Sequence, residues 1–165
     1  MRRQQFAQKA FIWDGDRLFV VRKSADDPHN PGRWEVPGGR MEFGEDVDEH
    51  LSREVSEETG LRVQPGAPFH IWQWTMTDIV PGSNDELQVI AVARQCAPHD
   101  SKDVSPTDAH RDPTDFLAEM RWVTLAELET LEVIPWLRPA LAMFVEHCAS
   151  FHVEADARDE AVRTS

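Results

Sequence analysis

The sequence predicts a mixed α/β sandwich that forms a single domain. Three observations lead to this fold class. Short apolar runs recur between turn-forming residues, one well-marked amphipathic helix lies between two groups of these runs, and a second long helical segment follows near the C-terminus. The 165 residues are 41% hydrophobic and include six Trp and eight Phe, which is enough to fill one core.

The first strands lie in the N-terminal forty residues. Residues 6–13 and 18–22 are apolar runs joined by an Asp-Gly turn, which predicts an antiparallel hairpin. Residues 24–33 are turn-forming throughout, and a loop of this length is a candidate for function. Residues 34–36 alternate like a short strand, and we expect that strand to stop at the following Pro-Gly-Gly.

The central helix has clear signals at both ends. Glu45 and Asp46 place carboxylates at its N-terminus, apolar residues recur at every fourth position from 47 to 55, and Gly60 is suited to the C-cap. The remaining elements follow in order. We expect strands at 61–63, 69–76, 87–96 and 119–123, a surface loop at 97–113, a short helix at 125–131 and a final helix at 135–151. We assign residues 1–153 to the domain and 154–165 to a disordered tail.

Charge and hydropathy exclude several classes of function. The net charge is −13, and residues 42–60 alone carry eight acidic side chains against one basic one. Arg2, Arg3 and Lys9 form only a thin basic cluster at a terminus that we expect to be mobile, so a nucleic acid polymer is not the predicted partner. There is neither an apolar run long enough to span a membrane nor a secretory signal, which predicts a cytoplasmic protein. The chain's two cysteines, Cys96 and Cys148, are too few and too far apart for a disulfide framework or a zinc site.

Three carboxylates are crowded on one side of the central helix. At 100° per residue, Glu54, Glu57 and Glu58 share a sector of roughly 100° beside the apolar face. Like charges at this spacing repel, and the repulsion grows with burial. A hard divalent cation such as Mg²⁺ converts it into coordination. Gly38 and Gly39 lie just before the helix, where their lack of a Cβ lets the backbone approach a ligand.

The segment from Gly39 to Leu61 resembles the Nudix box of the Nudix hydrolases. All its fixed positions are occupied, by Gly39, Glu45, Arg53, Glu54, Glu57, Glu58 and Gly60, and its hydrophobic positions by Val55 and Leu61. The resemblance implies a three-layer α/β/α sandwich with a mixed sheet. It also implies Mg²⁺-dependent hydrolysis of a nucleoside diphosphate linked to another group, by attack of water on phosphorus, with Mn²⁺ as a possible substitute for Mg²⁺.

The same resemblance implies roles for individual residues. Glu54, Glu57 and Glu58 hold the metal, with the Gly39 carbonyl as a possible further ligand. Glu45 and Arg53 brace the loop against the helix, with Gly38 and Gly60 as structural glycines. Glu119 is our candidate for an additional acidic ligand or general base, and Asp115 is its substitute. The predicted catalytic set is therefore the three box glutamates with Arg53 and Glu119.

Residues outside the box are candidates for binding the substrate. Arg22 and Lys23 end a strand beside the long loop, and Arg40 follows the glycine pair, where its guanidinium can meet a phosphate. Trp34 is a candidate for stacking a base, and we weigh Phe43, Trp72 and Trp74 with it, although core packing is the default for most of them. His50 lies one turn before Glu54, and we expect it at the surface.

Subfamily markers narrow the substrate. The chain contains no Tyr, and it lacks the motifs of the enzymes that act on dinucleoside polyphosphates, NADH or ADP-ribose. The segment before the box resembles that of triphosphate-sanitising members, but Trp136 and Leu137 stand where enzymes that recognise oxidised guanine often have Asn. We therefore predict a small nucleotide as substrate, either a nucleoside triphosphate or a nucleotide sugar. A homodimer is possible.

Two other functional classes stay open. A non-catalytic Nudix-fold module that senses a nucleotide is the main alternative, although such modules usually lose box carboxylates and this chain keeps them all. Isomerisation of an isoprenoid diphosphate needs a reactive cysteine near the site. Cys96 and Cys148 are predicted in a strand end and in the last helix, which fits that activity poorly.

Overall fold

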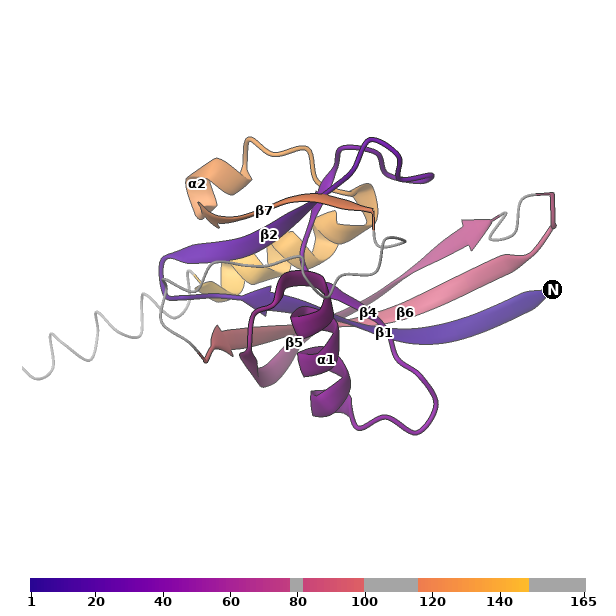
Figure 1. Ribbon diagram of the computed structural model, residues 1–165, viewed down its shortest axis with the longest axis horizontal. Coiled ribbons are helices and arrows are strands. Elements are labelled where there is room, and N and C mark those ends of the chain that lie inside the picture. The colour runs from indigo at the N-terminus through magenta and orange to yellow at the C-terminus, as the bar shows by residue number, and fades with distance from the viewer. Residues whose placement is uncertain (78–81, 100–115, 149–165) are drawn as a thin grey trace, which may run out of the picture.

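A computed structural model of the protein describes residues 1–77, 82–99 and 116–148 (Figure 1). Its helices and strands, in chain order, are β1 (Arg2–Ile12), β2 (Arg17–Lys23), β3 (Trp34–Glu35), β4 (Gly38–Arg40), α1 (Val47–Thr59), β5 (Val63–Thr77), β6 (Glu86–Pro98), β7 (Leu117–Thr124), α2 (Leu125–Leu128) and the 3-10 helix η2 (Pro135–Leu137), which leads into helical residues 138–148. The predicted tail at 154–165, most of the predicted loop at 97–113 and Asp115 lie outside the described residues.

The strands form two sheets. The larger sheet has the order β4-β1-β6-β5. It is mixed, because β1 and β6 are parallel whereas β4 and β1, and β6 and β5, are antiparallel. The smaller has the order β3-β2-β7 and is antiparallel. The register shifts of β5 against β6 lie at Pro65 and Pro68, as expected for residues that have no N–H to donate.

Two helices cover opposite faces of these strands. Leu51 and Val55 of α1 pack in one buried cluster with alternate residues of β1 and β2, such as Ala10 and Phe19. The intervening residues of the same strands, such as Phe11, face a second cluster that contains Phe144 of the last helix. Figure 1 shows α1 and the last helix on the two sides of the strands. The predicted α/β/α sandwich is confirmed.

The predicted N-terminal hairpin is wrong in its pairing. The Asp-Gly turn is present, with Asp14 Oδ1 accepting from the backbone N–H groups of Asp16 and Arg17. However, β1 and β2 meet only at one bridge, between Trp13 and Leu18, and then enter different sheets. The apolar pattern predicted the two strands correctly, but both strands are buried on two faces, so the pattern contains no information about their partners.

We expect the strand at 34–36 to stop at the Pro-Gly-Gly segment, but in the structure the two glycines of this segment begin a further strand. Residues 38–40 form β4, which pairs with residues 7–9 of β1. Gly38 has φ of +137°, and a Cβ there would lie 2.2 Å from the backbone oxygen of Gln8, so only glycine fits this close pairing. The N-terminus is also not a free segment, because Arg2, Arg3 and Lys9 all lie in β1.

Helix α1 has both predicted caps. Asp46 is its N-cap, and its side chain accepts from the N–H groups of Asp48 and Glu49, an arrangement worth about 1 kcal/mol. Gly60 is the C-cap in the left-handed conformation, with φ of 72°. These caps fix the two ends of the helix that carries the box glutamates.

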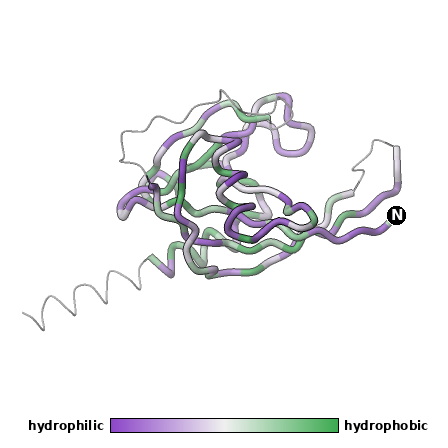
Figure 2. The backbone as a smooth tube through the Cα atoms, turned by 60° about the horizontal axis from the view of Figure 1, so that its bottom comes forward, coloured by the Kyte–Doolittle hydropathy of each residue, from purple (hydrophilic) through white to green (hydrophobic). Residues whose placement is uncertain are grey.

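The polar N-terminal end of β1 projects from the body beside the neighbouring ends of β5 and β6 (Figures 1 and 2). In Figure 2 this end is hydrophilic, whereas hydrophobic segments are concentrated in the body of the protein. No helix in the described ranges is long and apolar enough to cross a membrane.

Candidate active site

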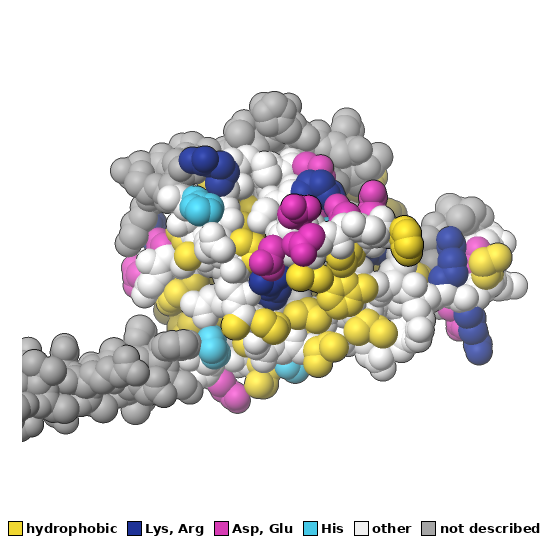
Figure 3. Space-filling model, turned by 90° about the horizontal axis from the view of Figure 1, so that it is seen from below, with side chains coloured by type: hydrophobic (Ala, Val, Ile, Leu, Met, Phe, Trp, Pro, Cys, Tyr) yellow, Lys and Arg dark blue, Asp and Glu magenta, His cyan; other side chains and the backbone are white. Residues whose placement is uncertain are grey.

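A cavity of about 530 Å³ opens where α1, β1, β4 and the loop at 24–33 meet. On this face of the protein, acidic side chains gather beside a hydrophobic patch (Figure 3). The described residues that line the cavity are Ala7, Lys9, Lys23, Asp27, Pro28, His29, Asn30, Glu35, Gly38, Gly39, Arg40, Glu54, Glu58, Trp74, Met76, Val89, Phe116, Ile134 and Trp136.

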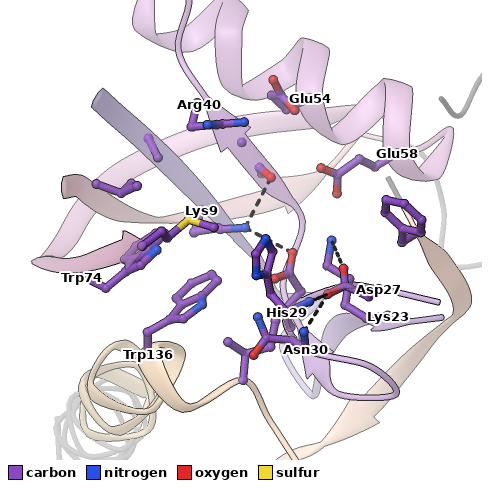
Figure 4. Close-up of a pocket in the computed structure, with 18 of the residues that line it drawn as sticks. Lys9, Lys23, Asp27, His29, Asn30, Arg40, Glu54, Glu58, Trp74 and Trp136 are labelled. Carbon is purple, nitrogen blue, oxygen red and sulfur yellow. Dashed lines mark hydrogen bonds and ion pairs between the residues drawn. The ribbon is translucent and has the colours of Figure 1, made fainter. Parts of the chain in front are cut away.

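Glu54 and Glu58 project from successive turns of α1 into this cavity (Figure 4). Glu58 is 9% exposed, and its Oε2 is buried without a hydrogen-bond partner among the described residues. Burial raises the pKa of Glu58 to about 8 and also raises the pKa of Glu54, although neighbouring Arg53 opposes the second effect. Two carboxylates are thus held where ionisation is costly unless a cation is present.

Gly39 lies directly against Glu54. A Cβ added to Gly39 would be 2.4 Å from Glu54 Oε2, which is far inside the van der Waals distance. The absence of a side chain at Gly39 therefore lets this carboxylate lie on the backbone of β4. This contact joins two residues that are separated in the sequence but belong to the same predicted site.

Arg53 links the loop before α1 to the helix. Its Nε donates to Glu45 Oε1 at 2.7 Å, and its Nη1 lies 3.0 Å from Glu57 Oε2 and 3.2 Å from Glu54 Oε1. The hydrogen bond from Arg53, together with that from the backbone N–H of Glu42, lowers the pKa of Glu45 to about 2. The hydrogen bond to Glu45 and the negative charges of Glu54 and Glu57 in turn raise the pKa of Arg53. The predicted bracing by Glu45 and Arg53 is present, and Arg53 also contacts carboxylates of the helix.

Glu57 does not line the cavity. Its side chain is 52% exposed and is held by Arg53. Within the described ranges, no three Asp, Glu, His or Cys side chains are gathered as a ready set of metal ligands. A metal held by all three box glutamates therefore requires Glu57 to exchange its contact with Arg53 for one in the cavity, which an exposed side chain can do by rotation.

His50 is fully buried, so the prediction of a surface histidine is wrong. Its Nδ1 lies 2.8 Å from Gln8 Nε2, and its Nε2 lies 3.7 Å from Glu54 Oε1. Burial lowers the pKa of His50. His50 Nε2 lies beside Glu54 but has no hydrogen-bond partner in the described part of the chain.

A buried ion pair that the sequence did not predict lies in the cavity. Lys9 and Glu35 are only 6% and 5% exposed, and Lys9 Nζ lies 3.2 Å from Glu35 Oε1 and 3.3 Å from the carbonyl oxygen of Gly38. Lys9 lies in the buried half of β1, and Glu35 ends β3 between Trp34 and Val36. Opposite charges inside two buried strands are the signal that could have identified the pair.

The wall across from the glutamates is aromatic. Trp74 and Trp136 stack with ring centroids 4.0 Å apart and an interplanar angle of 8°. Trp74 was among the residues weighed for stacking, whereas Trp136 was considered only as a departure from the oxidised-guanine pattern. The two indoles come from β5 and η2, whose proximity no local pattern in the sequence shows.

The loop at 24–33, which we predict to be functional, borders the cavity. Asp27 Oδ1 accepts from the N–H groups of His29 and Asn30, which fixes this turn. Lys23 also lines the cavity, and its Nζ lies 3.9 Å from Asp27 Oδ2.

The structure brings only some of the predicted substrate residues together. Arg40 lines the cavity and donates from Nη1 to Gln5 Oε1 at 3.0 Å. Arg22 instead pairs with Glu119 at 3.0 Å across β2 and β7. Trp34 is buried in the core, with the guanidinium of Arg121 4.5 Å from its ring centroid. Arg22, Trp34 and Glu119 are not among the described residues of the cavity lining.

The two cysteines, Cys96 and Cys148, are free and buried. Burial raises the pKa of both thiols to about 11, which is the opposite of what a reactive cysteine requires. Neither thiol is among the described residues of the cavity lining. These observations argue against the isomerase alternative.

Known proteins share this sequence pattern. The family profile described as NUDIX domain matches residues 3–144. The nucleoside triphosphatase NudI of Enterobacter sp. (strain 638) is 27% identical over 139 residues, which are 79% of this chain and 89% of that protein. An 8-oxo-dGTP diphosphatase of Escherichia coli (strain K12) is 30% identical over 78 residues, which are 47% of this chain and 60% of that protein.

Solved structures share the fold. The crystal structure of a MutT protein from Methanosarcina mazei Go1 has a TM-score of 0.60 at 24% identity and covers 93% of this chain and 96% of its own. The solution structure of the E. coli ORF135 protein has a TM-score of 0.63 at 18% identity, covering 90% of this chain and 93% of its own. Because the NUDIX profile spans most of the sequence, including the glutamate helix and the glycine turn that build the cavity, the chain belongs to the NUDIX domain family.

Proposed function

We propose that this protein is a Mg²⁺-dependent nucleotide pyrophosphohydrolase. Its substrate is a nucleoside triphosphate or a nucleotide sugar, cleaved by attack of water on a phosphorus atom. The observation that carries the proposal is one cavity with buried carboxylates, Glu54 and Glu58, on one wall and stacked indoles on the other. The similarity to a nucleoside triphosphatase over most of both chains supports this substrate class.

The residues present fit a hard divalent cation. Glu58 Oε2 is a buried oxygen without a partner in the described part of the chain, and Glu54 lies against the backbone of Gly39. Mg²⁺ prefers such oxygen ligands together with substrate phosphates. We propose that Glu54, Glu58, the Gly39 carbonyl and a rotated Glu57 hold it, with Mn²⁺ as a substitute. When bound, the metal supplies activation of water and neutralisation of the leaving phosphate.

Other side chains position the substrate. Lys23 and Arg40 lie on the cavity lining and can bind phosphate oxygens beyond the carboxylates. Arg53 holds the loop of Glu45 against α1, so it acts through the position of the glutamates. Because Glu119 pairs with Arg22 outside the described cavity lining, the structure favours a box glutamate over Glu119 as the general base.

The test is a turnover assay on a panel of nucleoside triphosphates and nucleotide sugars with millimolar Mg²⁺. We expect release of a nucleoside monophosphate with pyrophosphate or a phosphorylated group, and a loss of at least about 100-fold in Glu58→Gln. Equal rates for the wild type and Glu58→Gln contradict the proposal. Thermal stabilisation by a nucleotide that is not turned over would instead identify a binding module.

A further inference from the structure

The ion pair between Lys9 and Glu35 lies in the cavity but has no part in the proposed chemistry at phosphorus. Burying two charges is costly, and a buried pair adds little to stability compared with apolar residues of the same volume. The pair is also incompletely used within the described structure. Lys9 Nζ uses two of its three N–H donors, one for Glu35 Oε1 and one for the Gly38 carbonyl. The bond to Lys9 uses only one of the two carboxylate oxygens of Glu35.

The pair lies beside the aromatic wall. Lys9 Nζ is 5.1 Å from the ring centroid of Trp136, which is itself stacked on Trp74. Figure 4 shows Lys9 between the indoles on one side and Glu54 and Glu58 on the other. A flat ring that lies against the indoles can therefore present its edge to the ion pair while the attached phosphates reach α1.

We propose that Lys9 and Glu35 read the edge of a nucleobase and select guanine nucleotides. This inference rests on the proposed function, in that it takes the cavity to bind a nucleotide. Guanine presents two neighbouring acceptors, N7 and O6, followed by two neighbouring donors, N1–H and the N2 amino group. The one remaining N–H of the Lys9 ammonium can be shared between O6 and N7, the two atoms that lysine contacts in the DNA major groove, while the Glu35 carboxylate accepts from N1–H and N2.

The other bases match a side-by-side cation and anion less well. Adenine alternates acceptor, donor and acceptor along N7, N6 and N1, and uracil alternates in the same order along O4, N3 and O2, so neither base presents two acceptors beside two donors. Cytosine has one donor followed by two acceptors, so it fits the pair with one bond fewer and covers less of the indoles. The expected order of affinity is guanine, then cytosine, then adenine and uracil.

Binding of nucleoside monophosphates tests this order without any need for turnover. The probes are GMP, CMP, AMP and UMP in Mg²⁺, with the intrinsic tryptophan fluorescence of the protein, to which Trp74 and Trp136 contribute, as the readout. We expect GMP to bind at least about tenfold more tightly than AMP, since one well-matched pair of base contacts discriminates by about this factor. Equal affinities, or tighter binding of AMP, overturn the inference. 8-Oxo-GMP carries a hydrogen on N7 and loses one acceptor, so tighter binding of 8-oxo-GMP than of GMP also contradicts it.

A double variant tests the residues. Lys9→Met with Glu35→Gln removes both charges at nearly constant volume, so neither charge is left without a partner. We expect it to bind GMP and AMP within about threefold of each other, because the matched contacts are lost and stacking remains. The matched control, Arg2→Met with Glu86→Gln, removes an exposed ion pair between β1 and β6 and keeps the wild-type preference.

The outcomes separate this inference from the proposed function. Turnover of all four triphosphates with no difference in monophosphate affinity keeps the function and rejects the base-reading role. A preference for GMP without turnover of any nucleotide rejects the enzyme and keeps the role. If the double variant does not fold, the order of monophosphate affinities of the wild-type protein still supports or rejects the preference for guanine.

Discussion

Replacing the buried Glu58 by Gln tests the electrostatics of the cavity. The pKa of Glu58 is raised from 4.5 to about 8, chiefly by burial. Between these values the folded, metal-free protein keeps a proton on Glu58 that the unfolded chain releases, so the free energy of unfolding falls as pH rises through this window. The whole effect is at most about 5 kcal/mol, of which roughly 2 to 3 kcal/mol falls between pH 5 and 7.

The assay is urea unfolding of metal-free wild type and Glu58→Gln at several pH values from 5 to 8. Because glutamine does not titrate, we expect the variant to gain stability over the wild type by about 2 to 3 kcal/mol between pH 5 and 7. His50, whose pKa is lowered by burial, destabilises both proteins as pH falls below its usual value, so its effect cancels in the difference. Glu49→Gln, an exposed change on the same helix, should follow the wild type. Parallel curves for the wild type and Glu58→Gln would refute the reasoning.

Four further substitutions test the site. Gly39→Ala forces Glu54 to move, so we expect about 100-fold lower turnover at nearly unchanged Tm. In Gly38→Ala the new Cβ meets backbone atoms instead, so the free energy of unfolding in urea should fall by about 3 kcal/mol or more. Equal effects of the two substitutions on stability would contradict the geometry. Arg53→Lys keeps the positive charge but loses the planar guanidinium that contacts Glu45 and Glu57 at the same time, so kcat should fall by about tenfold or more. An unchanged kcat would exclude the bracing role. Trp136→Ala should weaken nucleotide affinity by about tenfold or more in titration calorimetry, and unchanged affinity would remove the indoles from the binding site.

The family and the layers of the fold could be predicted from the sequence because their signals are local. The spacing of carboxylates, the apolar period of α1 and its caps all lie within a few turns of one helix. The partners of strands were not predictable in this way. β1 and β2 follow each other across a tight turn yet enter different sheets, because a strand that is buried on both faces has no patterned side to direct its pairing.

In the candidate site, too, the residues of one local motif could be predicted from the sequence, whereas residues that meet only in the fold could not. The box glutamates, Gly39 and Arg53 were found because they lie in one continuous motif. Lys9 and Glu35 are 26 positions apart in the sequence and meet only in the fold, so no local pattern could predict that they pair. Conversely, Trp34 was chosen for its type and its position near the motif, and its ring is used in the core. A homodimer, a cytoplasmic location and a disordered tail stay predictions.

The most direct test of the central claim, that the box carboxylates hold Mg²⁺ for hydrolysis, is the release of pyrophosphate by Glu57→Gln over a range of Mg²⁺ concentrations. Glu57 is half exposed and bonded to Arg53, and glutamine can keep that bond, so the folded structure should persist. We expect wild-type stability, with turnover at least about 100-fold lower than in the wild type and in the matched exposed variant Glu49→Gln. Wild-type turnover by Glu57→Gln, with the same dependence on Mg²⁺, would contradict the account.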